Sequence, residues 1–388
     1  MYRILTHNKI SVKGLDKFSR DKYEVASEIV RPDAIMLRSH QLTPDAIADS
    51  VTAIGRAGAG VNNIPVDSCT ERGIVVFNAP RANANAVKEL VLAGLLLCGR
   101  DILGGIDYLK QANGLDEAAL HSYVEEGKKQ FAGVELAGKT LGVVGLGAIG
   151  SLVAEAGLML GMRVLGLDPA LSVAAAWQLP RDVERIENMQ TLLSRSDYVT
   201  LHLPVLEATR NLINKDLVAS FKPGLVLLNF SREQLVDTAA LITALDTGRL
   251  RRYVSDFPMP ELLGRNDVVL LPHLGASTAE AEENCAIMIA DQLIDFLADG
   301  NIKNSVNFPN TYLERSGVCR LAISNRNVPK MLGQILSLLA DREHNVVDMI
   351  NKSRGDIAYN LIDIEREAQD DLVPLLEAID GVINARLL

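Results

Sequence analysis

The stretch "TLGVVGLGAIGSLVAEAGLMLG", residues 140–161, decides the fold. An apolar run that fits a buried strand leads into Gly145, Gly147 and Gly150, and then into an apolar helical pattern. In such a turn the first glycine permits a tight bend, the second lets the backbone approach a pyrophosphate, and the third lets the helix pack on the strand. The stretch therefore predicts a dinucleotide-binding unit with the anion at the helix N-terminus.

A second β-like run, "RVLGLDP", ends in Asp168, eighteen residues after Gly150. A carboxylate at this point can accept hydrogen bonds from a ribose diol and repels a 2′-phosphate, so we expect NAD as the cofactor rather than NADP. The alternative is that Asp168 only caps the turn before Pro169. We favour cofactor binding because the surrounding strand and helix are those that the motif requires.

Alternating β-like and helical segments lie on both sides of this unit. We expect an α/β protein with two doubly wound parallel-sheet domains, in which a Rossmann-type nucleotide domain is inserted into a flavodoxin-like substrate domain. Two long helices, at about 85–109 and 278–300, are expected to join them. A βαββαβ order beyond residue 309 predicts a ferredoxin-like domain. The expected boundaries are 1–92 with 285–312 for the substrate domain, 93–284 for the NAD-binding domain and 313–388 for the C-terminal domain.

Composition excludes several classes of function. The 388 residues carry a net charge of −10, which argues against nucleic-acid and anionic-membrane partners because both need a basic face. The N-terminal segment is too short and too polar for a signal peptide, and no apolar run is long enough to span a membrane, so we expect a cytoplasmic protein. The four cysteines lie far apart, without a CxxC pair or a nearby histidine, so no metal site is expected.

Three residues suggest the chemistry. Arg232 in "LLNFSREQLVDTAAL" and His273 in "LLPHLGAST" each follow a β-like run, and open α/β sheets bind ligands beyond the carboxyl ends of their strands. A guanidinium can clamp a carboxylate, and an imidazole can exchange the proton of a neighbouring hydroxyl. Glu261 in "SDFPMPELLGR" is the candidate carboxylate that would favour the protonated imidazole. Each could singly be a loop or surface residue, but together they indicate oxidation of a 2-hydroxy acid.

Six motifs follow one another along the chain: "GRAGAGVNNI", "FNAPRANANAVKELV", "GKTLGVVGLGAIG", "LHLPVLEATRNLI", "NFSREQLVDTAAL" and "LLPHLGASTAEAEEN". In this order they resemble the signatures of the D-2-hydroxyacid dehydrogenases. The resemblance covers nearly the whole chain and is strongest to short members with one C-terminal ACT domain, which oxidise 3-phospho-D-glycerate to 3-phosphohydroxypyruvate at the start of L-serine biosynthesis. It implies an NAD-dependent dehydrogenase that acts on a small-molecule substrate. It also implies that the protein forms a homo-oligomer, either a dimer or a tetramer.

The resemblance also implies residue roles. It assigns catalysis to Arg232, Glu261 and His273, and it implies that Asp256 contacts the nicotinamide carboxamide. Ala148 stands where the family often has an arginine. The implied cofactor-binding residues are Gly145, Gly147, Ala148, Ile149, Gly150, Asp168, His202, Pro204, Thr209, Asp256, His273 and Gly275. The implied substrate-binding residues are Arg38, Ser39, Arg56, Ala57, Gly58, Ala59, Gly60, Asn83 and Arg232.

Several alternatives stay open. The ACT-like segment implies an L-serine effector at Asn325, Asn327 and Asn345, although Lys330 replaces the usual glycine of the loop, and the alternative is a role in dimerisation only. The substrate could instead be 2-oxoglutarate, glyoxylate or hydroxypyruvate, as in other D-2-hydroxyacid dehydrogenases. The chain could also be an NAD(H)-sensing regulatory protein on the same fold. Lys128 and Lys129 either reach a substrate phosphate or are solvated.

Overall fold

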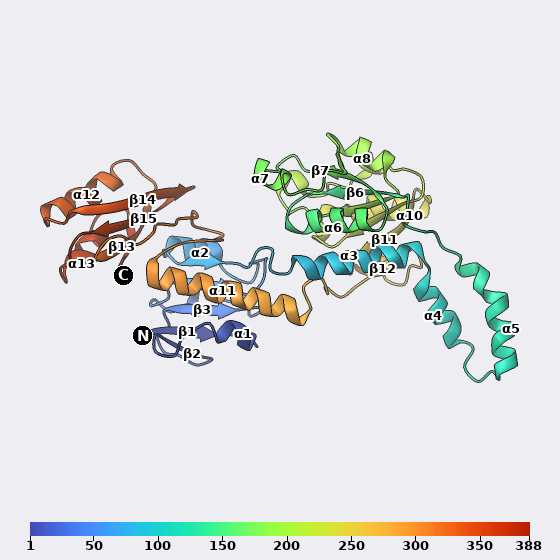
Figure 1. The fold of residues 1–388 in the computed structure, drawn as a ribbon, viewed down its shortest axis with the longest axis horizontal. Coiled ribbons are helices and arrows are strands. Elements are labelled where there is room, and N and C mark those ends of the chain that lie inside the picture. The colour runs from blue at the N-terminus through green and yellow to red at the C-terminus, as the bar shows by residue number, and fades with distance from the viewer. The chain divides into compact units, whose positions relative to one another are not determined.

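The computed structural model describes residues 1–388, apart from the side chain of Ala174. The chain forms two compact units, residues 1–83 with 279–388 and residues 84–278 (Figure 1). The chain passes between the units at residues 84 and 279, whereas the sequence suggested 93 and 285. The boundary moves because all of helix α3 (Ala84–Gly99) packs with the second unit, where Val87 and Val91 share a core with Val143.

The second unit is built on a seven-stranded sheet whose neighbouring strands are parallel. Its strands are Thr140–Val144 (β6), Arg163–Leu167 (β7), Val183–Arg185 (β8), Tyr198–Leu201 (β9), Leu225–Asn229 (β10), Leu250–Ser255 (β11) and Val268–Leu270 (β12). Their order is β12-β11-β10-β9-β6-β7-β8, which reverses direction between β6 and β9. This order confirms the predicted Rossmann-type sheet, and the reversal is where such sheets bind dinucleotides.

Helices cover both faces of this sheet. One face packs against α3 and α6 (Ala148–Met159), whose Val91 and Val153 share a core with Val143 of β6. The opposite face packs against three helices through a second core, which includes Leu193, Leu241 and Leu227. Those helices are α8 (Met189–Arg195), α9 (Lys215–Val218) and α10 (Thr238–Asp246), and the short α7 spans Val173–Ala176.

The prediction of one long helix over residues 85–109 is wrong. Helix α3 ends at Gly99, and a separate α4 (Ile102–Lys110) follows. The N–H of Val134 donates to the carbonyl oxygen of Gly99 at 2.8 Å, and a Cβ added to Gly133 would lie 2.3 Å from the same oxygen. The returning chain thus occupies the end of α3 and stops its continuation.

Helices α4 and α5 (Glu117–Gly127) form an arm that extends away from the sheet of their unit (Figure 1). The rings of Tyr108 and Tyr123 stack 4.2 Å apart, and the Tyr108 hydroxyl donates to the carbonyl oxygen of Tyr123. None of the described side chains of α4 is buried. The arm is therefore held together by its own contacts rather than by the core.

The first unit contains a five-stranded parallel sheet in the order β2-β1-β3-β4-β5, which is the flavodoxin-like order. Helix α11 (Ala279–Asp299) covers one face, where Ile289 and Leu293 pack with Met36, and α2 (Val66–Glu71) lies on the other, where Cys69 packs with Ile54. The strands are Tyr2–Thr6 (β1), Tyr23–Ala26 (β2), Ala34–Leu37 (β3), Ala53–Arg56 (β4) and Val75–Phe77 (β5), and α1 spans Val12–Leu15.

The C-terminal segment adds an antiparallel sheet to the first unit, in the predicted βαββαβ order. One face packs on its own two helices, and the other joins the core around α11, where Tyr359 and Leu361 meet Phe296. The fully buried Arg320 and Asp363 form an ion pair, and Arg320 also donates to the carbonyl oxygen of Asp299 at the end of α11. The elements are β13 (Cys319–Arg326), α12 (Met331–Asp341), β14 (Val346–Arg354), β15 (Ile357–Ile364), α13 (Leu372–Glu377) and β16 (Val382–Leu387), and the sheet order is β14-β15-β13-β16.

Short 3-10 helices complete the structure at Pro44–Ala46 (η1), Lys128–Phe131 (η2), Glu207–Thr209 (η3), Glu233–Leu235 (η4) and Pro260–Leu262 (η5). Among the described residues, none of the helices combines the length and the apolar character that crossing a membrane requires.

Candidate active site

The turn between β6 and α6 has the geometry of a cofactor loop. Gly145 has a φ of +89°, and a Cβ added there would lie 2.4 Å from the carbonyl oxygen of His202. A Cβ at Gly150 would lie 1.9 Å from the carbonyl oxygen of Gly145. Both positions therefore need glycine because a side chain would collide with the neighbouring backbone of the protein. Gly147 differs, because no described atom lies within 4 Å of a Cβ added there. Open space in front of Gly147, at the start of α6, fits the approach of a pyrophosphate.

Asp168 lies beside this turn at the end of β7. Its Oδ2 accepts the N–H of Leu146 at 2.8 Å, and its Oδ1 accepts the N–H of Ala170 at 2.9 Å. The residue thus caps the turn before Pro169 and also fixes the glycine loop. Each carboxylate oxygen can accept a further hydrogen bond, so capping and ribose binding are compatible rather than alternatives.

His202 is held against the same loop. The backbone N–H of His202 donates to the carbonyl oxygen of Val144 at 2.7 Å, and the ring Nε2 lies 2.9 Å from the Thr200 hydroxyl. Burial lowers the pKa of the His202 imidazole to about 3, so the ring is neutral at physiological pH. Its Nδ1 is buried and has no hydrogen-bond partner among the described residues. Nearby, the Thr209 hydroxyl donates to the carbonyl oxygen of Pro204 at 2.7 Å.

One buried carboxylate fixes the loop that carries His273. Asp256, which is 1% exposed, accepts the N–H of Leu274 on Oδ1 and the N–H of Gly275 on Oδ2, both at 2.6 Å. The carbonyl oxygen of Asp256 accepts the N–H of His273 at 3.1 Å. His273 has a φ of +57°, and its exposed ring packs edge-on against Phe257. Three consecutive hydrogen bonds therefore hold His273 in an unfavourable backbone conformation.

A buried asparagine that the sequence analysis missed positions Arg232. The Asn229 Nδ2 donates to the carbonyl oxygen of Arg232 at 2.8 Å, and the Asn229 Oδ1 accepts the N–H of Ser231 at 3.2 Å. The carbonyl oxygen of Asn229 also accepts the N–H of Asp256 at 3.3 Å. Asn229 thus links the loops after β10 and β11. An amide at the end of the apolar run "LVLLN" was the available sequence signal.

Glu261 is the predicted site residue with the weakest structural support. It lies on η5 with an exposed side chain. Within the part of the chain that the structure describes, no hydrogen bond or ion pair joins Glu261 to His273. The carboxylate that contacts the His273 loop is therefore that of Asp256, not that of Glu261.

The first unit gathers the predicted substrate arginines at the ends of β3 and β4. The Arg56 Nε donates to the carbonyl oxygen of Arg38 at 3.1 Å. The Arg38 Nη1 lies 2.5 Å from Oε1 of Glu282 on α11, a residue that the sequence analysis did not single out. A Cβ added to Gly58 would lie 2.5 Å from the Arg56 Nη1, so the guanidinium lies directly over the Gly58 backbone.

Further polar contacts hold the loop around these arginines. Asn8 accepts the N–H groups of Ser39 and His40 on its Oδ1, and the Asn63 amide donates to the carbonyl oxygens of Arg38 and His40. Three hydrogen bonds hold the segment that follows Arg56. The N–H of Ala57 donates to the carbonyl oxygen of Leu37, and the carbonyl oxygens of Gly58 and Ala59 accept from the N–H of Ala79 and the side chain of Asn78. Among the described residues, Asn83, the last residue of this stretch of the first unit, makes no hydrogen bond to this group.

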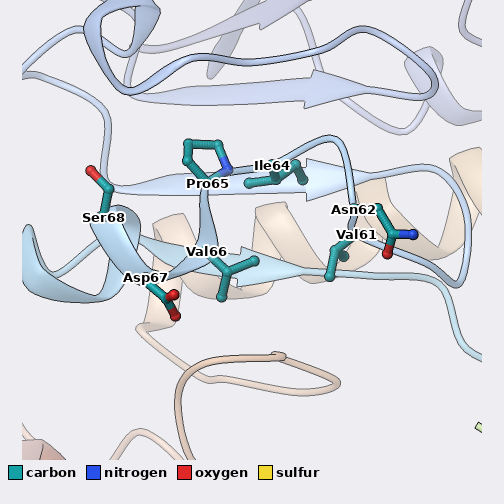
Figure 2. Close-up of a pocket in the computed structure, with 7 residues that line it drawn as sticks. All are labelled: Val61, Asn62, Ile64, Pro65, Val66, Asp67 and Ser68. Carbon is teal, nitrogen blue, oxygen red and sulfur yellow. The ribbon is translucent and has the colours of Figure 1, made fainter. Parts of the chain in front are cut away.

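A cavity of about 560 Å³ lies next to this loop. Figure 2 shows the residues that line it, which follow Gly60 in the chain and reach the first turn of α2. None of them is a predicted site residue, so the cavity neighbours the arginine group without including it. The lining residues are Val61, Asn62, Ile64, Pro65, Val66, Asp67 and Ser68.

The predicted effector residues are separated by their contacts. Asn325 is buried and accepts a hydrogen bond from Asn360 at 2.7 Å, whereas Asn327 donates to the carbonyl oxygen of Gly355 and Asn345 to Glu365. Lys330 has a φ of +78°, a conformation that favours glycine. Asn325 and Asn327 lie near the start of β15, whereas Asn345 accepts the N–H of Glu365 beyond its end, so the structure does not bring the three asparagines together within one chain.

Lys128 forms an ion pair with Glu125 one helical turn away, and both side chains are exposed. Of the two alternatives for Lys128, this contact favours a solvated surface residue over one that reaches a substrate phosphate.

Comparisons with known proteins agree with this arrangement. Residues 106–275 match the family described as D-isomer specific 2-hydroxyacid dehydrogenase, NAD binding domain. The D-3-phosphoglycerate dehydrogenase of Methanocaldococcus jannaschii is 33% identical over 95% of this chain and 68% of its own length. The enzyme of the same name from Haemophilus influenzae is 32% identical over 95% of this chain and 89% of its own.

A solved structure supports the fold. The NAD⁺-bound 3-phosphoglycerate dehydrogenase of Entamoeba histolytica superimposes with a TM-score of 0.63 and 24% identity, covering 80% of this chain and 99% of the other. The glycine turn, the open space at Gly147 and the position of Asp168 fit NAD as the cofactor. The chain belongs to the D-isomer specific 2-hydroxyacid dehydrogenases and is an NAD-dependent dehydrogenase.

Proposed function

We propose that the chain oxidises 3-phospho-D-glycerate to 3-phosphohydroxypyruvate, the first step of L-serine biosynthesis. The observation that carries the proposal is the pair Arg38 and Arg56, joined by a hydrogen bond at the ends of two adjacent strands. Two guanidinium groups suit a phosphate, and Arg232 remains for the carboxylate, so a substrate with two anionic groups is accounted for. Relatives named D-3-phosphoglycerate dehydrogenase support the same choice.

The reaction needs few protein groups. Bound NAD supplies the hydride acceptor. Arg232 binds the carboxylate and polarises the C2 oxygen, while the His273 imidazole accepts the proton of the C2 hydroxyl. Asn229 and Asp256 fix the backbone of these two loops, so both side chains start from defined positions.

Glu261 keeps its proposed role as the residue that stabilises protonated His273, and Asp256 its proposed contact with the nicotinamide carboxamide. Because no direct contact joins Glu261 to His273 in the described structure, the role needs its own test. Glu261→Gln is expected to shift the pH profile of kcat without changing the KM for NAD. An unchanged profile would remove Glu261 from the mechanism.

The direct test is turnover. The protein is mixed with NAD and 3-phospho-D-glycerate, the product is removed, and formation of NADH is followed by absorbance. In a second assay, oxidation of NADH is followed with each of four 2-oxo acids: 3-phosphohydroxypyruvate, 2-oxoglutarate, glyoxylate and hydroxypyruvate. Preferred turnover of the phosphorylated acid supports the proposal. Preference for another acid would replace the substrate, and NADH binding without any turnover would favour the NAD(H)-sensing alternative.

The C-terminal βαββαβ segment is proposed to be an ACT domain with L-serine as its effector. Its strand order and helix-covered face support this assignment. The separation of Asn325, Asn327 and Asn345 within one chain means that an effector site would need more than these three residues of one copy. Calorimetry with L-serine tests the effector, and the absence of heat together with unchanged rates would leave the segment a structural role.

A homo-oligomer is also proposed, and its support is the arm of α4 and α5. The apolar side chains of this arm face solvent within the chain, with Ile106 49% and Leu109 51% exposed. Covering such a surface with a second copy would remove it from water. Replacing both residues by glutamate is expected to yield a monomer in light scattering.

The proposed location of the protein is the cytoplasm.

A further inference from the structure

Helix α11 makes three ion pairs with the N-terminal part of its unit. Glu283 pairs with Lys13 at 2.6 Å, Asp291 with Lys17 at 2.9 Å, and Glu282 with Arg38 at 2.5 Å. The two lysines lie on or beside the short helix α1 and outside every predicted site. The third pair differs because its cation is a predicted substrate residue.

The charges around Arg38 form a compact group. Burial raises the pKa of the Cys285 thiol to about 11, while the positive charges of Arg38 and Arg56 oppose the rise and Glu282 adds to it. Both guanidinium groups and the carboxylate therefore lie within electrostatic range of one thiol. Two cations and one anion leave this group with a net positive charge, and the carboxylate offsets the repulsion between the arginines.

Glu282 controls a different part of Arg38 from its other partners. The backbone of Arg38 is fixed through its carbonyl oxygen, which accepts hydrogen bonds from Arg56 and Asn63. The direction of the side chain is set by Glu282, which contacts Nη1. A guanidinium has five N–H donors, so a contact at one nitrogen leaves donors for a second anion.

We propose that Glu282 is a positioning residue of the substrate anion site, which holds the Arg38 guanidinium in place for the phosphate and limits the affinity of that site for a dianion. The inference rests on the proposed function and names a residue that sets its phosphate selectivity. Glutamine at 282 keeps a hydrogen-bond acceptor and removes the negative charge, so phosphate binding strengthens. Alanine removes both the anchor and the charge, and the loss of a fixed Arg38 weakens binding.

The experiment compares Glu282→Gln, Glu282→Ala and the parent protein, with Glu283→Gln as the matched control on the same helix. KM is measured for 3-phosphohydroxypyruvate and for unphosphorylated hydroxypyruvate at saturating NADH. For the phosphorylated acid, Glu282→Gln is expected to lower KM and Glu282→Ala to raise it, each by about two- to fivefold, as befits a partly exposed ion pair. KM for hydroxypyruvate and the values for Glu283→Gln stay at the parental level.

The proposal is wrong if the two Glu282 variants do not move KM in opposite directions, if hydroxypyruvate responds equally, or if Glu283→Gln gives the same change. Failure of the proposed function looks different, because the parent protein would then turn over 3-phosphohydroxypyruvate no better than hydroxypyruvate, or not at all. In that case calorimetric titration with inorganic phosphate decides. Affinity in the order Glu282→Gln, parent, Glu282→Ala supports the anion site, and any other order overturns it.

Discussion

The two parallel sheets hold their predicted site residues by different means. After β10 and β11 of the second unit, the anchors are the buried side chains Asn229 and Asp256, which bind the main chain of the Arg232 and His273 loops. After β3 of the first unit, the Arg38 guanidinium is held by Glu282, and these side chains are 33% and 42% exposed. Buried anchors give a fixed geometry, whereas exposed charges give adjustable affinity. Changes in the second unit should therefore act on kcat, and changes in the first on KM.

The largest effect is expected for His273→Asn. Loss of the proton acceptor should lower kcat by about 10²- to 10⁴-fold, the usual contribution of general acid–base catalysis. Because the ring is exposed and the loop is held by main-chain contacts, NADH binding should be retained. Stopped-flow or steady-state turnover combined with NADH fluorescence titration checks both parts. Turnover near the parental rate would contradict the role of His273.

Asp256→Asn tests the buried anchor itself. The two oxygens of Asp256 accept hydrogen bonds from the N–H groups of Leu274 and Gly275, and an asparagine has only one such oxygen. One of the two N–H groups would therefore face the NH₂ group of the amide and lose its hydrogen bond. Leaving a buried donor unpaired costs about 1–3 kcal/mol, and the loosened His273 loop should lower kcat by up to about 100-fold. Hydrogen exchange at residues 273–275 should quicken in parallel. Asp267→Asn, which breaks an ion pair with Arg265, is the control and should leave both unchanged.

Arg56→Gln tests the adjustable side of the comparison. Loss of one guanidinium should raise KM for 3-phosphohydroxypyruvate about tenfold and leave kcat near the parental value. Gly58→Ala should give the same change to a smaller degree, because the added Cβ would lie 2.5 Å from the Arg56 Nη1 and displace it. A fall in kcat with KM unchanged would show that the division between the two units is incorrect.

The last prediction concerns stability in acid rather than turnover. The folded-state pKa of His202 is about 3, below the ordinary value of 6.5, so the unfolded chain binds more protons between these values. This contribution to stability is complete above pH 6.5 and is lost as the pH falls toward 3, by up to about 1.4 kcal/mol per pH unit. Urea unfolding of His202→Gln should show a flatter acid dependence than the parent. Parallel curves would mean that His202 is solvated.

The sequence predicted the parts of the fold that short periodic patterns encode. The glycine turn, the parallel sheet of the second unit and the C-terminal βαββαβ order all follow from local alternation and turn residues. The break between α3 and α4 did not follow, because it depends on Val134 returning to the carbonyl oxygen of Gly99. Such a contact between distant segments leaves no mark in a local pattern.

The same limit applies to the candidate site. The sequence indicates Arg232 and His273 as candidates because they follow strands, and strand ends meet at one edge of a sheet. Asn229 and Glu282 were missed because their importance comes from a partner that the fold brings to them, at Arg232 and at Arg38. Local sequence patterns therefore indicate candidate residues at strand ends more readily than residues whose role comes from a distant contact.

The central claim is that this chain separates chemistry from phosphate recognition, and one ratio tests it most directly. That ratio is kcat/KM for 3-phosphohydroxypyruvate divided by kcat/KM for hydroxypyruvate, measured with NADH on the parent protein. We expect a ratio of at least about 10², which corresponds to about 2.7 kcal/mol of transition-state discrimination. A ratio near one would contradict the account, because Arg38 and Arg56 would then recognise no phosphate.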